Sequence, residues 1–324
     1  MKALLAFAVL SVTQVSSFHS SLFILSKQQN ILTTTLCNHQ ADAEVFDSIC
    51  NARYACTRFQ RYDGTSSSLD NPIATNSSME IVQGAKECLD ISRRAPSGFN
   101  VQPYRLLMVS TKEKKEVLAK YCIGRNADRV RDSDCTVLFL ADRECLREYK
   151  RFGKFLDISG SRRSKKPPSK WAKRKIQALI LLFSSGWPLP RLVSNPISFA
   201  IRTGSSFVSA ITRRKVLVPS LGSADTWATK NTMLVAMAFI LACTSRGYAS
   251  CPMEGYNIGG IRRVLNIPRR YSIPLIVSVG TPYERINEDV NDDVGMEHGP
   301  GKNQQTHRYP TTEVIFEEEF QIIK

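Results

Sequence analysis

Histidine and metal-binding motifs are scarce in this sequence of 324 residues. The four histidines are His19, His39, His298 and His307. The nine cysteines include no C-x-x-C pair, and several of them lie in apolar runs. Zinc sites draw on clusters of these residue types at short spacings, so no metal centre is predicted. The cysteines are interpreted as buried thiols and not as a disulfide scaffold.

The sequence also lacks internal repeats and a dinucleotide fingerprint. No G-x-G-x-x-G stands between a strand-like and a helix-like run, so no Rossmann site for NAD(P)H is predicted. Hydrophobic residues make up 43% and charged residues 23% of the chain, which is typical of one large or two small globular domains. Collagen-like, coiled-coil and disordered classes are therefore excluded.

Acidic residues are unusually few in one segment. The whole chain carries 44 Lys and Arg against 29 Asp and Glu, a net charge of +15. Residues 143–215 alone hold 18 basic and 3 acidic residues, whereas the rest of the chain holds 26 of each. This segment has neither a recognition-helix pattern nor interleaved aromatic residues, so no nucleic-acid partner is predicted.

Residues 1–43 are predicted to be a targeting leader that is removed. Met1-Lys2 precedes an apolar run that ends in small residues, as in a secretory signal. The residues from Phe18 to Ala41 contain many hydroxyl and amide side chains and no acidic one, which is typical of a transit peptide. This order resembles the two-part plastid leader of algae with secondary plastids, so plastid localisation is expected. The alternative is a protein of the secretory pathway.

Helix-like and strand-like patterns alternate over residues 44–324, which predicts a mixed α and β fold. Helices are expected at residues 44–58, 77–94, 112–120, 225–246 and 258–265. Strands are expected at residues 104–110, 136–141 and 273–279. The run Glu313 to Phe320 is expected to form an edge or exchanged strand.

The helix expected at 225–246 contains eleven consecutive apolar residues, Met233 to Cys243. A helix that is apolar all round must be buried on every side. Eleven residues are well short of a bilayer span. The centre of the fold or a dimer interface is therefore the expected place for this helix.

The basic segment 143–215 interrupts the alternation and is interpreted as an insert. Its cations precede an uncharged run, Ile176 to Pro190. This pattern suits contact of residues 160–215 with a membrane surface, where cations meet headgroups and apolar side chains enter the boundary. The favoured alternative is a lid or arm whose apolar side packs on its own protein.

Three short segments carry the candidate chemistry. The first is Arg53 to Phe59 (RYACTRF), the second is Ala95 to Tyr104 (APSGFNVQPY), and the third is Cys251 to Tyr256 (CPMEGY). Together they resemble the nitroreductase family of FMN enzymes, with similarity over most of the chain outside the insert. The resemblance implies an α+β fold with a mainly antiparallel sheet flanked by helices. It also implies a homodimer with FMN at the interface.

By this resemblance, the first segment binds the FMN phosphate. Arg53 offers a planar fork that holds two phosphate oxygens at once, and Arg308 matches a second phosphate-binding arginine of the family. The other cofactor contacts expected here are Tyr54, Ala55 and Thr57. The family has further basic residues where this chain has Thr57 and Thr306. Thr57 can still donate a hydroxyl hydrogen bond.

The second and third segments are expected to contact the flavin ring. The contacts expected from the second segment are Pro96, Ser97, Gly98 and Asn100, in a turn whose backbone amides face a ligand. Those expected from the third are Pro252, Met253, Glu254 and Gly255, with a backbone amide at Glu254 or Gly255 reaching flavin N5. Cys251 is not expected to be a nucleophile, because no histidine is available to activate it. No side chain is assigned a catalytic proton transfer.

The activity implied by the resemblance is a two-step hydride transfer. NADH or NADPH gives a hydride to FMN N5, and an electron-poor small molecule such as a nitroaromatic or a quinone then receives it. One alternative is a reductive dehalogenase of the same fold, with the insert as its lid. The other is a non-catalytic flavin-binding or membrane-associated protein.

Overall fold

The computed structural model describes residues 39–60, 78–145, 224–283 and 308–316, together with scattered residues between 169 and 211. The chain forms two compact units, Met1–Ala52 and Arg53–Lys324, and each is described by itself. Residues 39–52 of the first unit form a largely exposed helix. The helix expected at 44–58 was therefore wrong beyond residue 52. The chain is extended there, because Ala55 and Phe59 form β-bridges.

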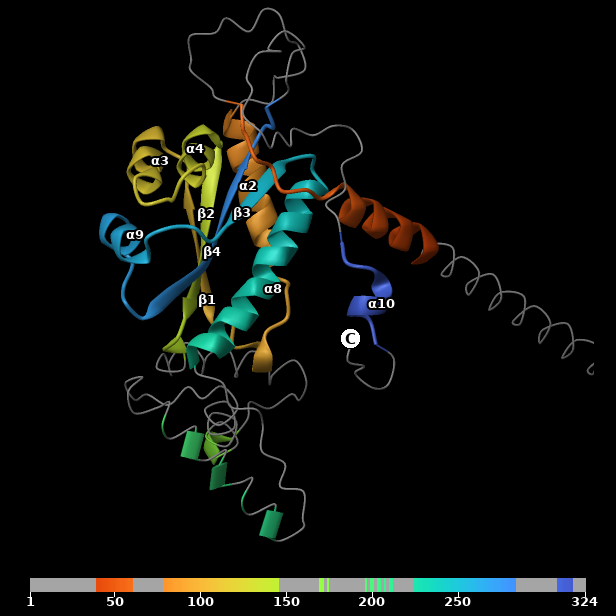
Figure 1. The fold of residues 1–324 in the computed structure, drawn as a ribbon, viewed down its shortest axis with the longest axis vertical. Helices are drawn as coiled ribbons and strands as arrows, with labels where there is room; N and C mark the ends of the chain where they lie inside the picture. Colours follow the sequence, from red (N-terminus) through yellow and green to blue (C-terminus); the bar gives the residue numbers. More distant parts are fainter. Residues whose placement is uncertain are drawn as a thin grey trace, which may run out of the picture. The chain divides into compact units, whose positions relative to one another are not determined.

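A four-stranded antiparallel sheet is the centre of the second unit, with strand order β1-β2-β4-β3 (Figure 1). The strands are β1 (Tyr104–Val109), β2 (Cys135–Asp142), β3 (Ala249–Met253) and β4 (Tyr271–Gly280). All of β2 is buried, which explains its nearly unbroken apolar sequence. Its buried Thr136 hydroxyl is satisfied by the Ser278 hydroxyl of β4 at 2.9 Å. The expected antiparallel α+β fold is confirmed.

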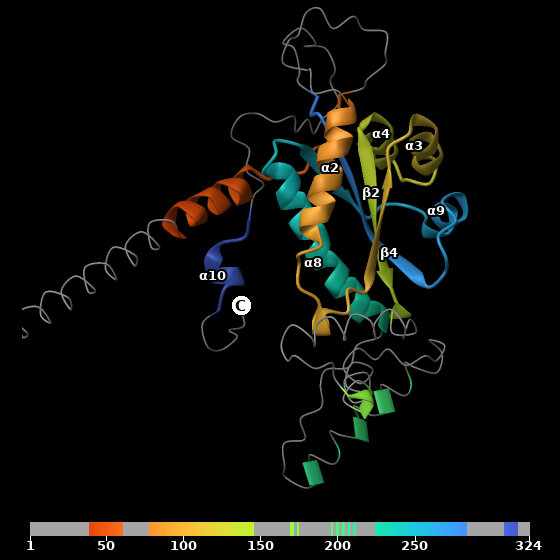
Figure 2. The same ribbon diagram turned by 180° about the vertical axis from the view of Figure 1, so that it is seen from behind.

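Helices α2 (Ser78–Ser92) and α8 (Ala224–Thr244) cover one face of the sheet, as Figures 1 and 2 show from opposite sides. Apolar side chains from both helices meet β1, β2 and β4 in one cluster. At its centre the rings of Phe139 on β2 and Phe239 on α8 pack 5.7 Å apart between centroids. This packing fixes α8 along the sheet.

The opposite face of the sheet is covered by α3 (Lys112–Ala119), α4 (Asn126–Asp132) and α9 (Ile258–Val264) (Figure 1). A second apolar cluster fills the space beneath them. Helix α4 was not anticipated, because its sequence NADRVRD is polar and only Val130 in it is buried. A single apolar residue leaves no helical period to detect.

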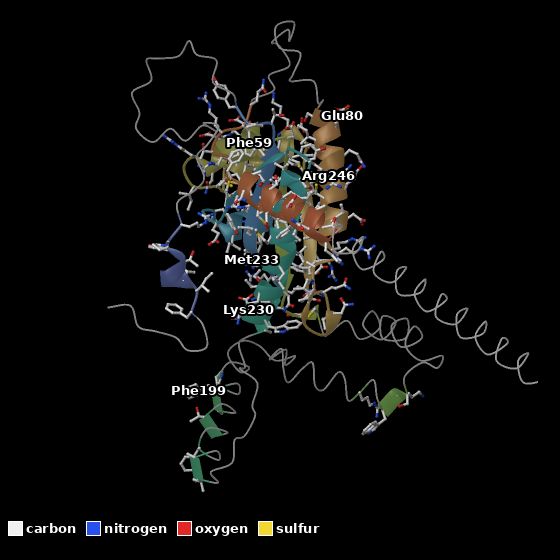
Figure 3. All side chains as sticks on the ribbon, turned by 90° about the vertical axis from the view of Figure 1, so that its right-hand side faces the viewer. Phe59, Glu80, Phe199, Lys230, Met233 and Arg246 are labelled. Carbon is white, nitrogen blue, oxygen red and sulfur yellow. The ribbon has the colours of Figure 1, made fainter. Side chains whose placement is uncertain are left out.

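Helix α8 is not buried on every side within one protomer, contrary to expectation. Val235, Ala236 and Phe239 are buried against the sheet, whereas Leu234 is 49% and Met237 46% exposed. Among the described residues it is the one helix long and apolar enough to cross a membrane, but its packing on the sheet is that of a core helix. Figure 3 looks onto the layer of α2 and α8 and labels Lys230 and Met233 on α8. The other expected place for it, a dimer interface, stays a prediction.

Near the end of the chain, Thr311–Val314 form a short helix, α10, whose last turn is closed by the Ile315 N–H bonding to Thr311 O at 2.8 Å. The strand expected at 313–320 was therefore wrong at its start. Its residues from 317 on lie outside the described residues, as do the leader up to residue 38 and most of the insert 143–215.

Candidate functional site

The first segment runs beside β3. Ala55 forms a parallel bridge with Ser250, and the N–H of Cys56 donates to Ser250 O at 2.9 Å. Cys56 points into the core, whereas its neighbours Ala55 and Thr57 are exposed and Arg53 and Tyr54 are half-buried. An extended chain alternates its side chains in this way, which leaves polar groups of the segment facing outward.

The third segment forms the end of β3 and the loop that follows it. Pro252 and Met253 are strand residues, and a proline is tolerated because β3 is an edge strand. Glu254 is exposed. The carbonyl of Gly255 accepts hydrogen bonds from Ile123 N at 3.0 Å and from Asn126 Nδ2 at 3.2 Å. A Cβ at Gly255 would lie 2.8 Å from Asn126 Nδ2, so a larger residue there would displace the Asn126 amide.

Helix α4 joins the first segment to the third. The Arg129 guanidinium donates from Nε to Thr57 O at 3.2 Å and from Nη1 to Asn126 Oδ1 at 2.7 Å. Asn126 in turn donates to Gly255 O. A cation thus lies where the two segments meet. Sequence reasoning missed both residues, and the signal that could have found them is an arginine and an asparagine three residues apart, which share one face of a helix.

The second segment is held by α8, at the end of this helix opposite from the one that leads into β3 (Figures 1 and 2). Its 3-10 turn, Gly98–Asn100, begins with the Gly98 N–H donating to Asn231 Oδ1 at 2.7 Å. The Gln102 N–H donates to Ser97 Oγ at 3.0 Å, and Asn100 adopts a positive φ of 54°. Asparagine tolerates this left-handed conformation better than most residues.

The remaining candidate, Arg308, is exposed and lies just before α10. Its expected approach to Arg53 stays a prediction. The described contacts place Ala55 and Cys56 against Ser250, and they link Thr57 to Gly255 through Arg129 and Asn126. The expected approach of Arg53, Tyr54, Pro252, Met253 and Glu254 to one ligand stays a prediction. In the second segment Gly98 is bonded to Asn231 of α8, and the expected flavin contacts of Pro96, Ser97 and Asn100 also stay predictions.

The sequence profile of the Nitroreductase family matches residues 69–281, about two thirds of the chain. The chain belongs to the nitroreductase family. A Bacillus subtilis (strain 168) protein, MhqN, whose name describes an NAD(P)H nitroreductase, is 22% identical over 194 residues, which are 60% of this chain and 75% of that protein. The expected membership of this family is thereby confirmed, whereas the first segment, Arg53 to Phe59, lies before the matched residues.

Solved structures of other nitroreductases share the fold. A Nitroreductase Family Protein from Streptococcus pneumoniae TIGR4 superposes with a TM-score of 0.53 at 18% identity, covering 84% of this chain and 100% of that one. A nitroreductase from Exiguobacterium sibiricum 255-15, solved in complex with FMN, gives a TM-score of 0.50 at 14% identity, covering 84% and 97%. At these sequence identities, the likeness to solved structures establishes only the fold of this chain.

The residues of this nitroreductase fit an anionic flavin. FMN requires cations for its phosphate and hydrogen-bonding groups for its polar edges. Arg129 still has N–H groups beyond the two in its described bonds, because a guanidinium carries five. The Ser97 hydroxyl accepts from Gln102, so its hydrogen is able to donate to a ligand. The chemistry of the donor set therefore suits the cofactor.

Burial keeps the thiols near the site protonated. It raises the pKa of Cys56 to about 11 and also raises the pKa of Cys251. The guanidinium of Arg129 opposes the shift at both thiols but does not cancel it. A protonated thiol is a poor nucleophile, so the chemistry does not run through Cys251.

Proposed function

We propose that this nitroreductase is an FMN-dependent oxidoreductase that uses NADH or NADPH to reduce an electron-poor small molecule, such as a nitroaromatic or a quinone. The observation that carries the proposal is the junction of the first and third segments under Arg129. Two segments from distant parts of the chain, each of which resembles a cofactor-binding segment of the family, converge beside one cation. Family membership and the FMN-containing relative of the same fold support the cofactor.

The phosphate is the part of the cofactor that Arg53, Arg129 and Arg308 would hold. Arg129 compensates for the missing family cation at Thr57, because its Nε bonds the carbonyl of that same residue. Guanidinium groups suit a phosphate dianion, since each can donate two parallel hydrogen bonds. The presence of Thr57 in place of the family's basic residue is therefore not expected to abolish FMN binding.

The ring is the part that the loop of Pro252, Met253, Glu254 and Gly255 would contact. The loop is restrained before any ligand arrives, because its last carbonyl is held by both Ile123 and Asn126. A restrained backbone presents its amides to a ligand without a further loss of conformational entropy on binding. When bound, FMN supplies the ring that takes a hydride from a nicotinamide and gives it to the acceptor.

A homodimer is part of the proposal. The exposed apolar side chains Leu234 and Met237 give α8 a self-complementary surface that a two-fold partner would cover. The second segment is anchored to the same helix through Asn231. A partner packed along α8 would thus bring its own Ser97 and Asn100 toward the first and third segments.

We also propose plastid delivery from the composition of residues 1–43, with the secretory pathway as the alternative. The basic insert is proposed to act as a lid or arm. Contact of residues 160–215 with a membrane surface is the alternative, which sedimentation with anionic vesicles would reveal.

The proposed function is tested by purifying the full chain and recording its visible spectrum. We expect a yellow protein that releases one FMN per chain on denaturation. We also expect it to oxidise NADH or NADPH when a nitroaromatic or a quinone is added. A halogenated tyrosine, offered beside them, tests the dehalogenase alternative. A protein that stays colourless after incubation with FMN contradicts the proposal.

Replacing Arg129 by methionine is expected to weaken FMN binding by about tenfold to a hundredfold, because hydrogen bonds to charged groups are the strong ones. The measurement is titration of flavin fluorescence with cofactor-free protein. Arg131→Met is the matched control on the same helix, since Arg131 is paired with Glu116 and Asp128. Equal affinities of the two variants would show that Arg129 does not hold the cofactor.

A further inference from the structure

Asn231 is a buried amide on α8, next to the buried hydroxyl of Thr232 on a largely apolar surface. It is 7% exposed and lies beneath the second segment. Its Oδ1 accepts from the Gly98 N–H at 2.7 Å, and its Nδ2 donates to Trp227 O at 2.7 Å. A buried amide costs free energy unless both of its ends are bonded, and here both are.

The two bonds leave the amide one orientation. A backbone carbonyl can only accept and a backbone N–H can only donate, so Nδ2 must face Trp227 O and Oδ1 must face Gly98. Asparagine is a poor residue for a helix interior, because its side chain competes for backbone partners. Here it bonds a backbone group outside its own helix, which a purely helical role does not require.

The turn is also held from below by the indole of Trp227. A Cβ at Gly98 would lie 3.1 Å from Trp227 Cζ2, so ring and turn are already at close contact. Asn231 thus fixes the Gly98 amide through a hydrogen bond. The Trp227 ring limits how closely the turn can approach α8. Of the predicted flavin contacts, Ser97 directly precedes this anchored turn and Asn100 is its last residue.

We infer that Asn231 is a positioning residue for the cofactor-binding turn, acting through the Gly98 amide without touching the cofactor. The inference rests on the proposed function. Because α8 also carries the proposed dimer surface, Asn231 ties the turn to the helix that would contact the partner. Displacing the turn would move both Ser97 and Asn100 away from their binding positions, and a shift of this kind lowers affinity.

Three variants of the full chain separate positioning from stability. Asn231→Leu removes both hydrogen bonds at similar volume. Asn231→Asp keeps an acceptor for the Gly98 N–H, loses the donor to Trp227 O and places a carboxylate oxygen beside that carbonyl. Thr232→Val is the matched control, since Thr232 is fully buried on the same helix and its hydroxyl donates to Ala228 O of that helix at 2.8 Å.

Two measurements are made on each variant. Amide hydrogen exchange of residues 97–102 is followed without cofactor, and FMN affinity is titrated by fluorescence. We expect Asn231→Leu to speed exchange in the turn and to weaken FMN binding about tenfold, the usual cost of one buried hydrogen bond. Asn231→Asp should exchange more slowly in the turn than Asn231→Leu, because the acceptor for the Gly98 N–H is kept. Thr232→Val should match the unmodified chain.

Other outcomes overturn the inference. Asn231→Leu behaving like Thr232→Val in both measurements would show that the amide only stabilises α8. Asn231→Leu that weakens FMN binding without speeding exchange in the turn would show that the bond to Gly98 is not what matters. If the unmodified chain binds no FMN, the proposed function fails on its own, and hydrogen exchange alone then decides whether Asn231 sets the turn.

Discussion

Replacing both Leu234 and Met237 by glutamate is expected to leave this nitroreductase monomeric and without bound FMN. These side chains are 49% and 46% exposed and lie three residues apart, so they share one face of α8. Burying two carboxylates in an apolar interface without partners costs several kcal/mol. If the second segment of each protomer serves the partner's site, the loss of the dimer removes Ser97 and Asn100 from it.

Light scattering and the flavin spectrum measure the two effects together. We expect the molar mass to fall by half and the FMN affinity to fall by more than about a hundredfold, since several polar contacts are lost at once. Val117→Glu on α3 is the control, because Val117 is 37% exposed on the opposite face of the sheet. A double variant that remains a dimer would place the interface elsewhere. A monomer that still holds FMN would place the whole site within one protomer.

Several elements of the fold were predictable because their sequences carry a strong local signal. The strand expected at 136–141 was found as Cys135–Asp142, since an apolar run buried on both faces is nearly unbroken. The helix expected at 225–246 was found as Ala224–Thr244. The expected elements were wrong or missing where contacts with residues distant in the sequence determine the backbone conformation. Residues 53–60 are drawn into bridges with distant strands, and α4 is held by contacts that its own sequence does not reveal.

The residue types of the candidate site could be predicted from the sequence, but the contacts between its segments could not. The three segments could be recognised from residue types, because phosphate and flavin binding require arginines and turns of particular composition. The residues that lie next to these segments in the folded structure could not be recognised in this way. Ala55 lies against Ser250 only through tertiary pairing, and Arg129 reaches Thr57 only because α4 packs over the same edge. Long-range pairing of this kind leaves no trace in local periodicity.

Replacing Asp142 by asparagine is expected to lower the free energy of unfolding by about 3 kcal/mol, as when one partner of a buried ion pair is removed. The Asp142 side chain is fully buried at the end of β2. Its Oδ1 accepts from Arg270 Nε and from Glu144 N, each at 3.0 Å, and its Oδ2 forms an ion pair with Arg270. Arg105 Nη2 lies 4.0 Å from Oδ2. Asparagine would keep the shape but remove the negative charge that faces these guanidinium groups.

Denaturant unfolding of the cofactor-free chain measures this loss, and Asp128→Asn is the control. Asp128 also pairs with an arginine, but its side chain is 65% exposed, so its loss should cost well under 1 kcal/mol. The consequence of Asp142→Asn should extend to the site. The N–H of Asp142 donates to Pro103 O at 2.9 Å, and Pro103 lies three residues after the turn that Asn231 anchors. If Asp142→Asn lowers both the FMN affinity and the free energy of unfolding, then the Asp142 ion pair with Arg270 and the turn form one rigid support. Unchanged affinity would show that α8 alone holds the turn.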